Sequence, residues 1–364
     1  MTANSAKAAI NELATAGRLG GLETGAPPTA SSVCEDTPTR AQARTRLYRA
    51  GRLVAQGFPV ADISDHLAEP GTVVWLDLCA PDRADLAVIS EEFALEPLAV
   101  EDAIQARERP KLDRYPSHLF LNTYAAYLDV HTGELATGEV AAFVTAQALI
   151  TVRKDDRFDP EHLTGVWDAN PDLAGHSVAF LLHGLLDYIV DGHFAAVEAL
   201  DDEIENLEDH LFDARSRSTD LQRRTFQLRK SLVILRRVVL PMREVVNTLM
   251  RRDLHVIDDT TAPYYQDVYD HVLRATEWTE SLRDLVTTIL ETNLTIQGNR
   301  LNEIMKKLTG WAAIIAVPTA VTGFFGQNVP YPGFAKESGF YASLAIMIGI
   351  GAGLYLIFKR KSWL

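Results

Sequence analysis

Several features that would place the chain in a familiar functional class are missing from the sequence. Its 364 residues include only two cysteines, Cys34 and Cys79, and their spacing suggests neither a metal site nor a disulfide framework. A net charge of −14 argues against a nucleic-acid partner, because a phosphate-binding surface is basic. The N-terminus has no apolar segment typical of cleavable signal peptides, so we expect none.

Motifs for hydrolysis and nucleotide binding are absent as well. No Gly-x-x-x-x-Gly-Lys-Ser/Thr loop occurs, and the ten histidines show no His-Glu-x-x-His or other paired-ligand spacing. No nucleophile and base stand out as a catalytic pair. We therefore expect a protein that is not an enzyme and has no bound cofactor.

Two long runs without a charged residue lie near the C-terminus, from Leu308 to Phe325 and from Ser338 to Phe358. Each approaches the roughly 20 residues that a helix needs to cross a bilayer, and the short link between them favours a helical hairpin. A buried hairpin of a soluble protein is the alternative. Basic residues flank the two runs on the side away from the link, so the positive-inside rule places both chain ends in the cytoplasm and the protein in the cell membrane. These basic residues are Lys306, Lys307, Lys359, Arg360 and Lys361.

The sequence ahead of these runs divides into three parts. Residues 1–42, rich in Ala, Gly, Ser, Thr and Pro, predict a disordered tail. Residues 43–170 predict a mixed α/β domain, because strand-like runs alternate there with a helical segment. Residues 171–262 show helical periodicity. The predicted fold class is an α+β cytoplasmic domain (a mixed α/β sandwich) with long helices and a two-helix transmembrane hairpin. The expected strands include residues 72–78, 118–130 and 139–154, with a turn at 131–134.

One very long helix is expected between the soluble part and the membrane. No proline occurs between Pro263 and Pro318, and a helix over this stretch would be roughly 80 Å long. Such a helix needs partners along its length, and homo-oligomerisation is the natural inference. Steps of three and four residues trace a mostly small or polar stripe on it, which favours either tight packing in the membrane or a narrow lumen. The stripe consists of Glu291, Thr295, Gly298, Asn302, Met305, Thr309, Ala312, Ala316 and Thr319.

Four segments, in order along nearly the whole chain, resemble the CorA-type magnesium transporter family. "WLDLCAP" followed by "FALEPLAVEDAIQARERPKLDRYPSHLFL" is similar to the family's cytoplasmic signature. "YYQDVYDHVLRATE" and "NRLNEIMKKLTGWAAIIAVPTAV" are similar to its long pore helix. "GQN" stands where most members have Gly-Met-Asn, and "KRKSWL" resembles their basic tail.

The resemblance implies a funnel-shaped homopentamer with a pore along its axis. Five copies of the long helix line this pore, the second span forms an outer ring, and the triplet lies at the outer mouth. The implied segments are residues 171–262 (willow helices), 263–327 (pore helix, with its membrane span at about 308–327), 328–338 (outer loop), 339–358 (second span) and 359–364 (basic cytoplasmic tail).

The resemblance also implies roles for single residues. Met305 and Leu308 match the family's hydrophobic gate, and Asn302 matches the polar ring just inside it. Asp102 and Asp267 match carboxylates that bind regulatory Mg²⁺ between neighbouring subunits. The remaining pore positions are Thr309, Ala312, Thr319 and the acidic Glu291, the selectivity motif is Gly326, Gln327 and Asn328, and the inner basic ring is Lys306, Lys307, Lys359, Arg360 and Lys361.

Mg²⁺ is the first expected substrate as well as the regulatory ligand, with Co²⁺ and Ni²⁺ using the same pore. Two departures from the family leave the substrate open. Gln327 replaces the usual Met, and "VPYPGFAKES" lacks the acidic stretch that commonly follows the triplet. The zinc-transporting ZntB branch also varies the middle residue, so Zn²⁺ transport is one alternative. A membrane-anchored Mg²⁺ sensor or scaffold that does not conduct is another.

Overall fold

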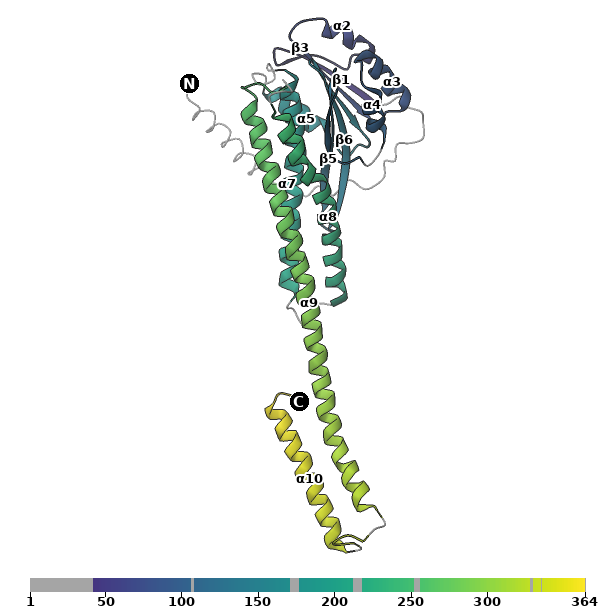
Figure 1. The fold of residues 1–364 in the computed structure, drawn as a ribbon, viewed down its shortest axis with the longest axis vertical. Coiled ribbons are helices and arrows are strands. Elements are labelled where there is room, and N and C mark those ends of the chain that lie inside the picture. Colours follow the sequence, from purple (N-terminus) through teal and green to yellow (C-terminus); the bar gives the residue numbers. More distant parts are fainter. Residues whose placement is uncertain are drawn as a thin grey trace, which may run out of the picture. The chain divides into compact units, whose positions relative to one another are not determined.

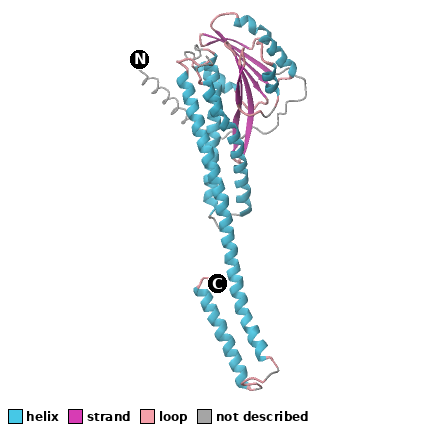
Figure 2. Ribbon diagram, in the orientation of Figure 1, coloured by secondary structure: helices cyan, strands magenta, loops and turns pink. Residues whose placement is uncertain are grey.

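The fold is seen in a computed structural model, which describes residues 42–105, 108–170, 177–211, 218–251, 256–327, 330–334 and 336–363. Figure 1 labels the elements along the chain, and Figure 2 distinguishes helices from strands. Asn328 and nearly all of the predicted N-terminal tail lie outside the described residues.

A seven-stranded sheet in the order β2-β1-β3-β7-β6-β5-β4 forms the centre of the N-terminal part. Neighbouring strands run antiparallel except β3 and β7, which are parallel. The strands are β1 (Gln42–Arg49), β2 (Arg52–Gln56), β3 (Thr72–Cys79), β4 (Lys111–Arg114), β5 (Leu119–Asp129), β6 (Glu134–Val144) and β7 (Ala148–Arg153).

The structure corrects one expected strand. Residues 139–154 do not form a single strand but the end of β6, a turn and β7. The turn forms because the Thr145 hydroxyl accepts hydrogen bonds from the backbone N–H groups of Gln147 and Ala148, at 3.3 and 2.9 Å. The expected turn between β5 and β6 is present, with Gly133 at a φ of 69° that favours glycine.

Helices cover both faces of the sheet, because its central strands carry apolar side chains on both sides. On β3, Val74 and Leu76 pack with α2, α3 and α4, whereas Trp75 packs with α5 and the long helices. This alternation follows from the two-residue period of a strand. The short elements are η1 (Val60–Asp62), α2 (Ile63–Leu67), α3 (Arg83–Glu92), α4 (Pro97–Ile104) and α5 (Pro160–Ala169).

A buried ion pair joins the two parallel strands. Asp77 on β3 is fully buried, and its carboxylate accepts hydrogen bonds from the Arg153 guanidinium on β7 at 2.7, 3.0 and 3.1 Å. The Thr151 hydroxyl donates a further hydrogen bond of 2.8 Å to Asp77. Removing one partner would leave an unpaired charge in the core and lower the stability of the fold by about 3–5 kcal/mol. The aspartate of the "WLDL" signature is therefore structural.

Three long helices follow, and a fourth completes a hairpin. These are α7 (Val178–Leu211), α8 (Ser218–Leu249), α9 (Ala262–Phe325) and α10 (Glu337–Arg360). The first part of α9 packs against α7 and α8, and its last part packs against α10 (Figure 1). The structure thereby confirms the predicted combination of an α/β domain, long helices and two apolar C-terminal helices.

Among the residues that the structure describes, three helices are long and apolar enough to cross a membrane, but they differ in how much of their apolar surface is buried. In the most apolar 18-residue stretch of each helix, 61% of the residues are buried for α7, but only 11% for α9 and 0% for α10. The apolar character of α7 is thus explained by core packing. The apolar character of α9 and α10 is not explained by burial within the described chain.

A buried histidine between α7 and β5 makes the stability of the fold sensitive to acid. His193 is fully buried, and its Nε2 donates a hydrogen bond of 2.6 Å to the carbonyl oxygen of Tyr124. Burial lowers the pKa of His193 to about 4, against a smaller opposing effect of that hydrogen bond. The neutral form is therefore the one that the fold accommodates.

We predict that His193→Gln reduces the loss of stability in acid. A lowered folded-state pKa means that full stability is present above pH 6.5 and is lost as the pH falls toward 4, by about 3 kcal/mol for this group. Glutamine can still donate to Tyr124 but does not titrate. Melting curves of the purified protein between pH 4 and 7 measure the difference, and parallel profiles for wild type and variant would contradict it.

Candidate functional site

The second half of α9 is exposed along almost its whole length. Beyond Asn293, Gly310 is the one buried residue of this helix, which the structure describes throughout. Large apolar side chains such as Leu301, Leu308 and Ile315 are 61–64% exposed. A surface of this kind must be covered by lipid or by other protein copies.

The predicted pore residues lie on this exposed half or just before it. All of them are exposed, and at 3.6 residues per turn they fall on one side of α9. Thr319 donates its hydroxyl proton to the carbonyl oxygen of Ile315 at 3.3 Å, so its oxygen lone pairs remain available to a cation or to water. Thr319 also lines a shallow open groove with its small neighbours. The residues so placed are Glu291, Asn302, Met305, Leu308, Thr309, Ala312 and Thr319.

Gly326 of the predicted selectivity motif ends α9. Its N–H donates to the carbonyl oxygen of Thr322 at 2.8 Å. A Cβ atom at this position would lie only 2.8 Å from the same oxygen, closer than real Cβ atoms come. The next residue, Gln327, is exposed. Glycine is therefore required here by a close approach of the backbone.

An aromatic cluster holds the described part of the outer loop against the end of α9. Tyr331 donates its hydroxyl to the carbonyl oxygen of Phe325 at 3.0 Å, and its ring lies 5.1 Å from that of Phe325 and 5.4 Å from that of Phe334. Phe324 completes the cluster at 5.5 Å from Phe325. Such aromatic side chains are typical of the membrane–water interface.

The two predicted regulatory carboxylates have different surroundings within one chain. Asp102 on α4 is about a quarter exposed and pairs with Lys111 at 2.6 Å. Asp267 on α9 is 71% exposed, and its Oδ2 lies 3.6 Å from Nδ1 of His271. Across the residues that the structure describes, no group of three or more acidic, histidine or cysteine side chains is placed to hold a metal ion. One chain thus presents these carboxylates separately.

Two further carboxylates on α7 were not predicted from the sequence. Burial, followed by the negative charge of Asp187, raises the pKa of Asp191 to about 6. Burial also raises the pKa of Asp187, and the charge of Asp267 adds to both effects. The four-residue spacing in "LLDYIVD" places both acids on one side of an otherwise apolar helix, and this was the signal available in the sequence.

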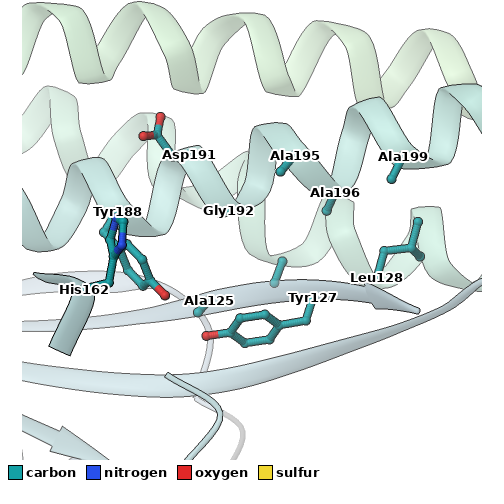
Figure 3. Close-up of a pocket in the computed structure, with 11 residues that line it drawn as sticks. Ala125, Tyr127, Leu128, His162, Tyr188, Asp191, Gly192, Ala195, Ala196 and Ala199 are labelled. Atoms are coloured by element: carbon teal, nitrogen blue, oxygen red, sulfur yellow. The ribbon is translucent and has the colours of Figure 1, made fainter. Parts of the chain in front are cut away.

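Asp191 also lies at the edge of a cavity of ≈ 460 Å³ between α7 and β5. Figure 3 shows the alanines and glycine of α7 facing Tyr127 and Leu128 of β5, with His162 and Tyr188 at one end. The Asp191 carboxyl group points away from Tyr127 and Leu128 (Figure 3). The negative charge of Asp191 is therefore presented on the side of α7 away from the sheet.

The predicted basic residues gather at one end of the helical hairpin. All five are exposed, and Lys307 pairs with Glu303 of α9 at 3.0 Å. Just beyond α10, Trp363 stacks on Phe358 with ring centres 5.5 Å apart. Because α9 enters and α10 leaves the hairpin at this end, Lys306 and Lys307 lie at the same end as Lys359, Arg360 and Lys361.

Comparison with known proteins gives consistent matches along the chain. A family model described as "CorA-like Mg2+ transporter protein" matches residues 70–360. The chain is 30% identical over 313 residues to the cobalt/magnesium transport protein CorA of Thermotoga maritima, which covers 84% of this chain and 88% of that protein. It is 29% identical over 294 residues to the putative metal ion transporter YfjQ of Bacillus subtilis, covering 79% and 89% respectively.

Solved structures resemble the chain in both its soluble and its membrane part. The complete structure of the CorA magnesium transporter from Methanocaldococcus jannaschii matches with a TM-score of 0.74 at 21% identity, covering 88% of this chain and 98% of that chain. The cytoplasmic domain of ZntB from Vibrio parahaemolyticus matches with a TM-score of 0.55 at 15% identity, covering 71% and 98%. At these identities the structural likenesses show the fold alone.

We predict that Gly326→Ala disturbs the outer end of the hairpin. The added methyl group would force the turn away from Thr322, at a cost of about 1–3 kcal/mol for an overpacked position. Gly351→Ala on α10 is the matched control, because nothing lies within 4 Å of its added Cβ atom. The measurement is the melting temperature of the purified protein, and an equal effect of the two variants would contradict the prediction.

Proposed function

The chain belongs to the CorA-like Mg²⁺ transporter family, whose members carry divalent cations across membranes, and from this premise we propose that it takes up Mg²⁺ through a pore made by five copies of α9. The observation that carries the proposal is the bare second half of this helix. It combines exposed apolar residues with a stripe of small and polar ones. A helix of this composition is stable in a membrane when its polar stripe faces other copies and water.

The selectivity motif fits an ion that keeps its water shell. Mg²⁺ binds oxygen in near-ideal octahedral geometry and gives up water reluctantly. A ring of amide oxygens from five copies of Asn328 can accept hydrogen bonds from that water shell without replacing it. The oxygen of Thr319 can do the same farther along the stripe, because its own proton is donated to Ile315. Such contacts select the hydrated ion and still permit its release.

Gating is assigned to the cytoplasmic end of the same stripe. Met305 and Leu308 offer no hydrogen bond to water, so a narrow ring of them dewets and closes the path. Asn302, three residues before Met305, supplies a polar ring beside this constriction, and Glu291 supplies an acidic one farther into the cytoplasm. Transport inward is driven by the membrane potential, which supplies about 4.6 kcal/mol per 100 mV for two charges. Both chain ends then lie in the cytoplasm of a cell whose plasma membrane holds the hairpin.

Regulation by cytoplasmic Mg²⁺ is assigned to Asp102 and Asp267. Each presents a partly or largely exposed carboxylate, and a cation between neighbouring subunits would bridge the two. The bridge stabilises a closed assembly, and its loss loosens the interface. The additional acidic charge of Asp187 and Asp191 beside Asp267 strengthens the attraction for cations at this part of α9.

Zn²⁺ is the second candidate substrate. Gln327 departs from the Gly-Met-Asn triplet, and the cytoplasmic part has the fold of the ZntB cytoplasmic domain. Against it, the sequence of α9 contains no cysteine to provide the soft ligand that Zn²⁺ favours. Uptake of the two ions therefore has to be measured side by side.

Uptake into liposomes tests transport and the role of Asn328 together. We predict that the purified protein admits Mg²⁺ and Co²⁺ and that Asn328→Ala lowers this uptake about tenfold or more, because its ring of amide oxygens is lost. Asn299→Ala is the matched control, since this exposed asparagine of α9 lies outside the stripe. Uptake of Zn²⁺ in preference to Mg²⁺ would favour the second candidate. No uptake by the wild type would favour a non-conducting sensor, and equal uptake by both asparagine variants would remove the triplet from the selectivity mechanism.

Limited proteolysis tests the regulatory carboxylates. We predict that millimolar Mg²⁺ protects the wild type and that Asp102→Asn or Asp267→Asn abolishes the protection, because each removes a ligand of the bridging cation. Asp270→Asn is the matched control: this aspartate is exposed on α9 and accepts a hydrogen bond of 3.0 Å from Gln266. Digestion of the wild type at the same rate with and without Mg²⁺ would refute the regulatory site.

A further inference from the structure

Asp102 has a cationic partner from its own chain. The ammonium group of Lys111, the first residue of β4, lies 2.6 Å from Oδ2 of Asp102. The two side chains are only 26% and 24% exposed, so solvent screens this ion pair less than one on the open surface. The pair thus occupies a carboxylate oxygen that a regulatory cation would use.

Lys111 is shared by two further carboxylates. Its Nζ lies 3.3 Å from Oδ2 of Asp113 and 3.8 Å from Oε2 of Glu108. Burial opposes the charge of the ammonium, but hydrogen bonds with Asp102 and Asp113 outweigh it and raise the pKa of Lys111. Three carboxylates face one ammonium, so the cluster keeps an excess of negative charge that attracts a cation.

We propose that Lys111 is an internal counter-ion that competes with the regulatory divalent cation for Asp102, an inference that rests on the proposed regulatory role of Asp102. A cation that uses Oδ2 has to displace the ammonium, because both require the lone pairs of the same oxygen. The displacement does not leave Lys111 unpaired, since Asp113 and Glu108 remain within its reach. Regulation at this carboxylate is then an exchange of an ammonium for a divalent ion.

This exchange sets the concentration at which the site fills. With Lys111 in place, the divalent ion must overcome both the lost ion pair and the repulsion from a positive charge a few ångströms away. A chain without this charge would bind its regulatory cation at lower concentrations. Lys111 therefore keeps the site empty until the cytoplasmic concentration is high enough to compete.

The test is a titration of Mg²⁺ protection against limited proteolysis in the purified full-length protein. We expect Lys111→Met to reach half-protection at roughly a tenfold lower Mg²⁺ concentration, because a unit charge next to the ligand is gone. Lys111→Arg keeps the charge and should stay near the wild type. Lys230→Met is the matched control, as Lys230 forms an exposed pair with Glu134 at 4.0 Å far from Asp102 in the sequence.

The double variant Lys111→Met with Asp102→Asn identifies the carboxylate through which Lys111 acts. If Lys111 competes for Asp102, its removal brings no gain of protection once Asp102 is replaced. A gain that persists in the double variant overturns the proposal. Melting curves without Mg²⁺ establish that each variant folds, and Lys111→Gln replaces the Met variant if that one does not.

The outcomes separate this inference from the regulatory role itself. If Asp102→Asn abolishes protection while Lys111→Met leaves half-protection unchanged or moves it to higher Mg²⁺, the counter-ion role is wrong and the regulatory site stands. Such a result would instead show that Lys111 positions Asp102. If Asp102→Asn keeps the half-protection concentration of the wild type, both proposals fail together.

Discussion

The exposed apolar surface on the second half of α9 is the constraint on which the rest of the structure depends. Its first half is packed against α7 and α8, whereas after Asn293 only Gly310 is buried. A 64-residue helix without a break joins the two halves. Because an unbroken helix behaves as a stiff rod, a shift at Asp267 is carried to Met305 without an intervening hinge. The same element can therefore connect the proposed cation site at Asp267 with the proposed path through the membrane.

Pro318, in the second half of α9, makes the helix locally less rigid. Pro318 has no backbone N–H, so the carbonyl group four residues earlier loses its helical partner. Two hydroxyl groups nearby donate to other carbonyl oxygens of the same turns rather than to that of Ile314. Thr322 donates to the carbonyl oxygen of Pro318 at 2.8 Å, and Thr319 donates to that of Ile315 at 3.3 Å. The helix can thus bend near Pro318, whereas no proline interrupts it around Met305.

The sequence predicted the elements whose signals are local. The absence of proline after Pro263 was enough to predict a continuous α9, and two uncharged runs were enough to predict the hairpin. The break between β6 and β7 was missed because it has no glycine or proline: Thr145 forms the turn with its side chain inside an apolar run. The pairing of Asp102 with Lys111 depends on how α4 meets β4, a tertiary contact that has no periodic signal. For the candidate site, residue spacing therefore predicts which side chains share one side of a helix. It does not predict which side chain pairs with a given carboxylate.

The charged residues near Met305 occupy different positions around α9. Lys306 and Lys307 follow Met305 directly, and at 3.6 residues per turn they point about 100° and 200° away from it. Lys307 is therefore turned off the stripe, whereas Lys306, four residues after Asn302, lies about 40° from that residue at the edge of the stripe. Glu291 lies on the stripe itself, in the part of α9 that still carries buried residues. A helix with this arrangement presents carboxylate, amide and hydroxyl oxygens along one side, with the ammonium group of Lys306 at the edge of that side and the ammonium group of Lys307 away from it.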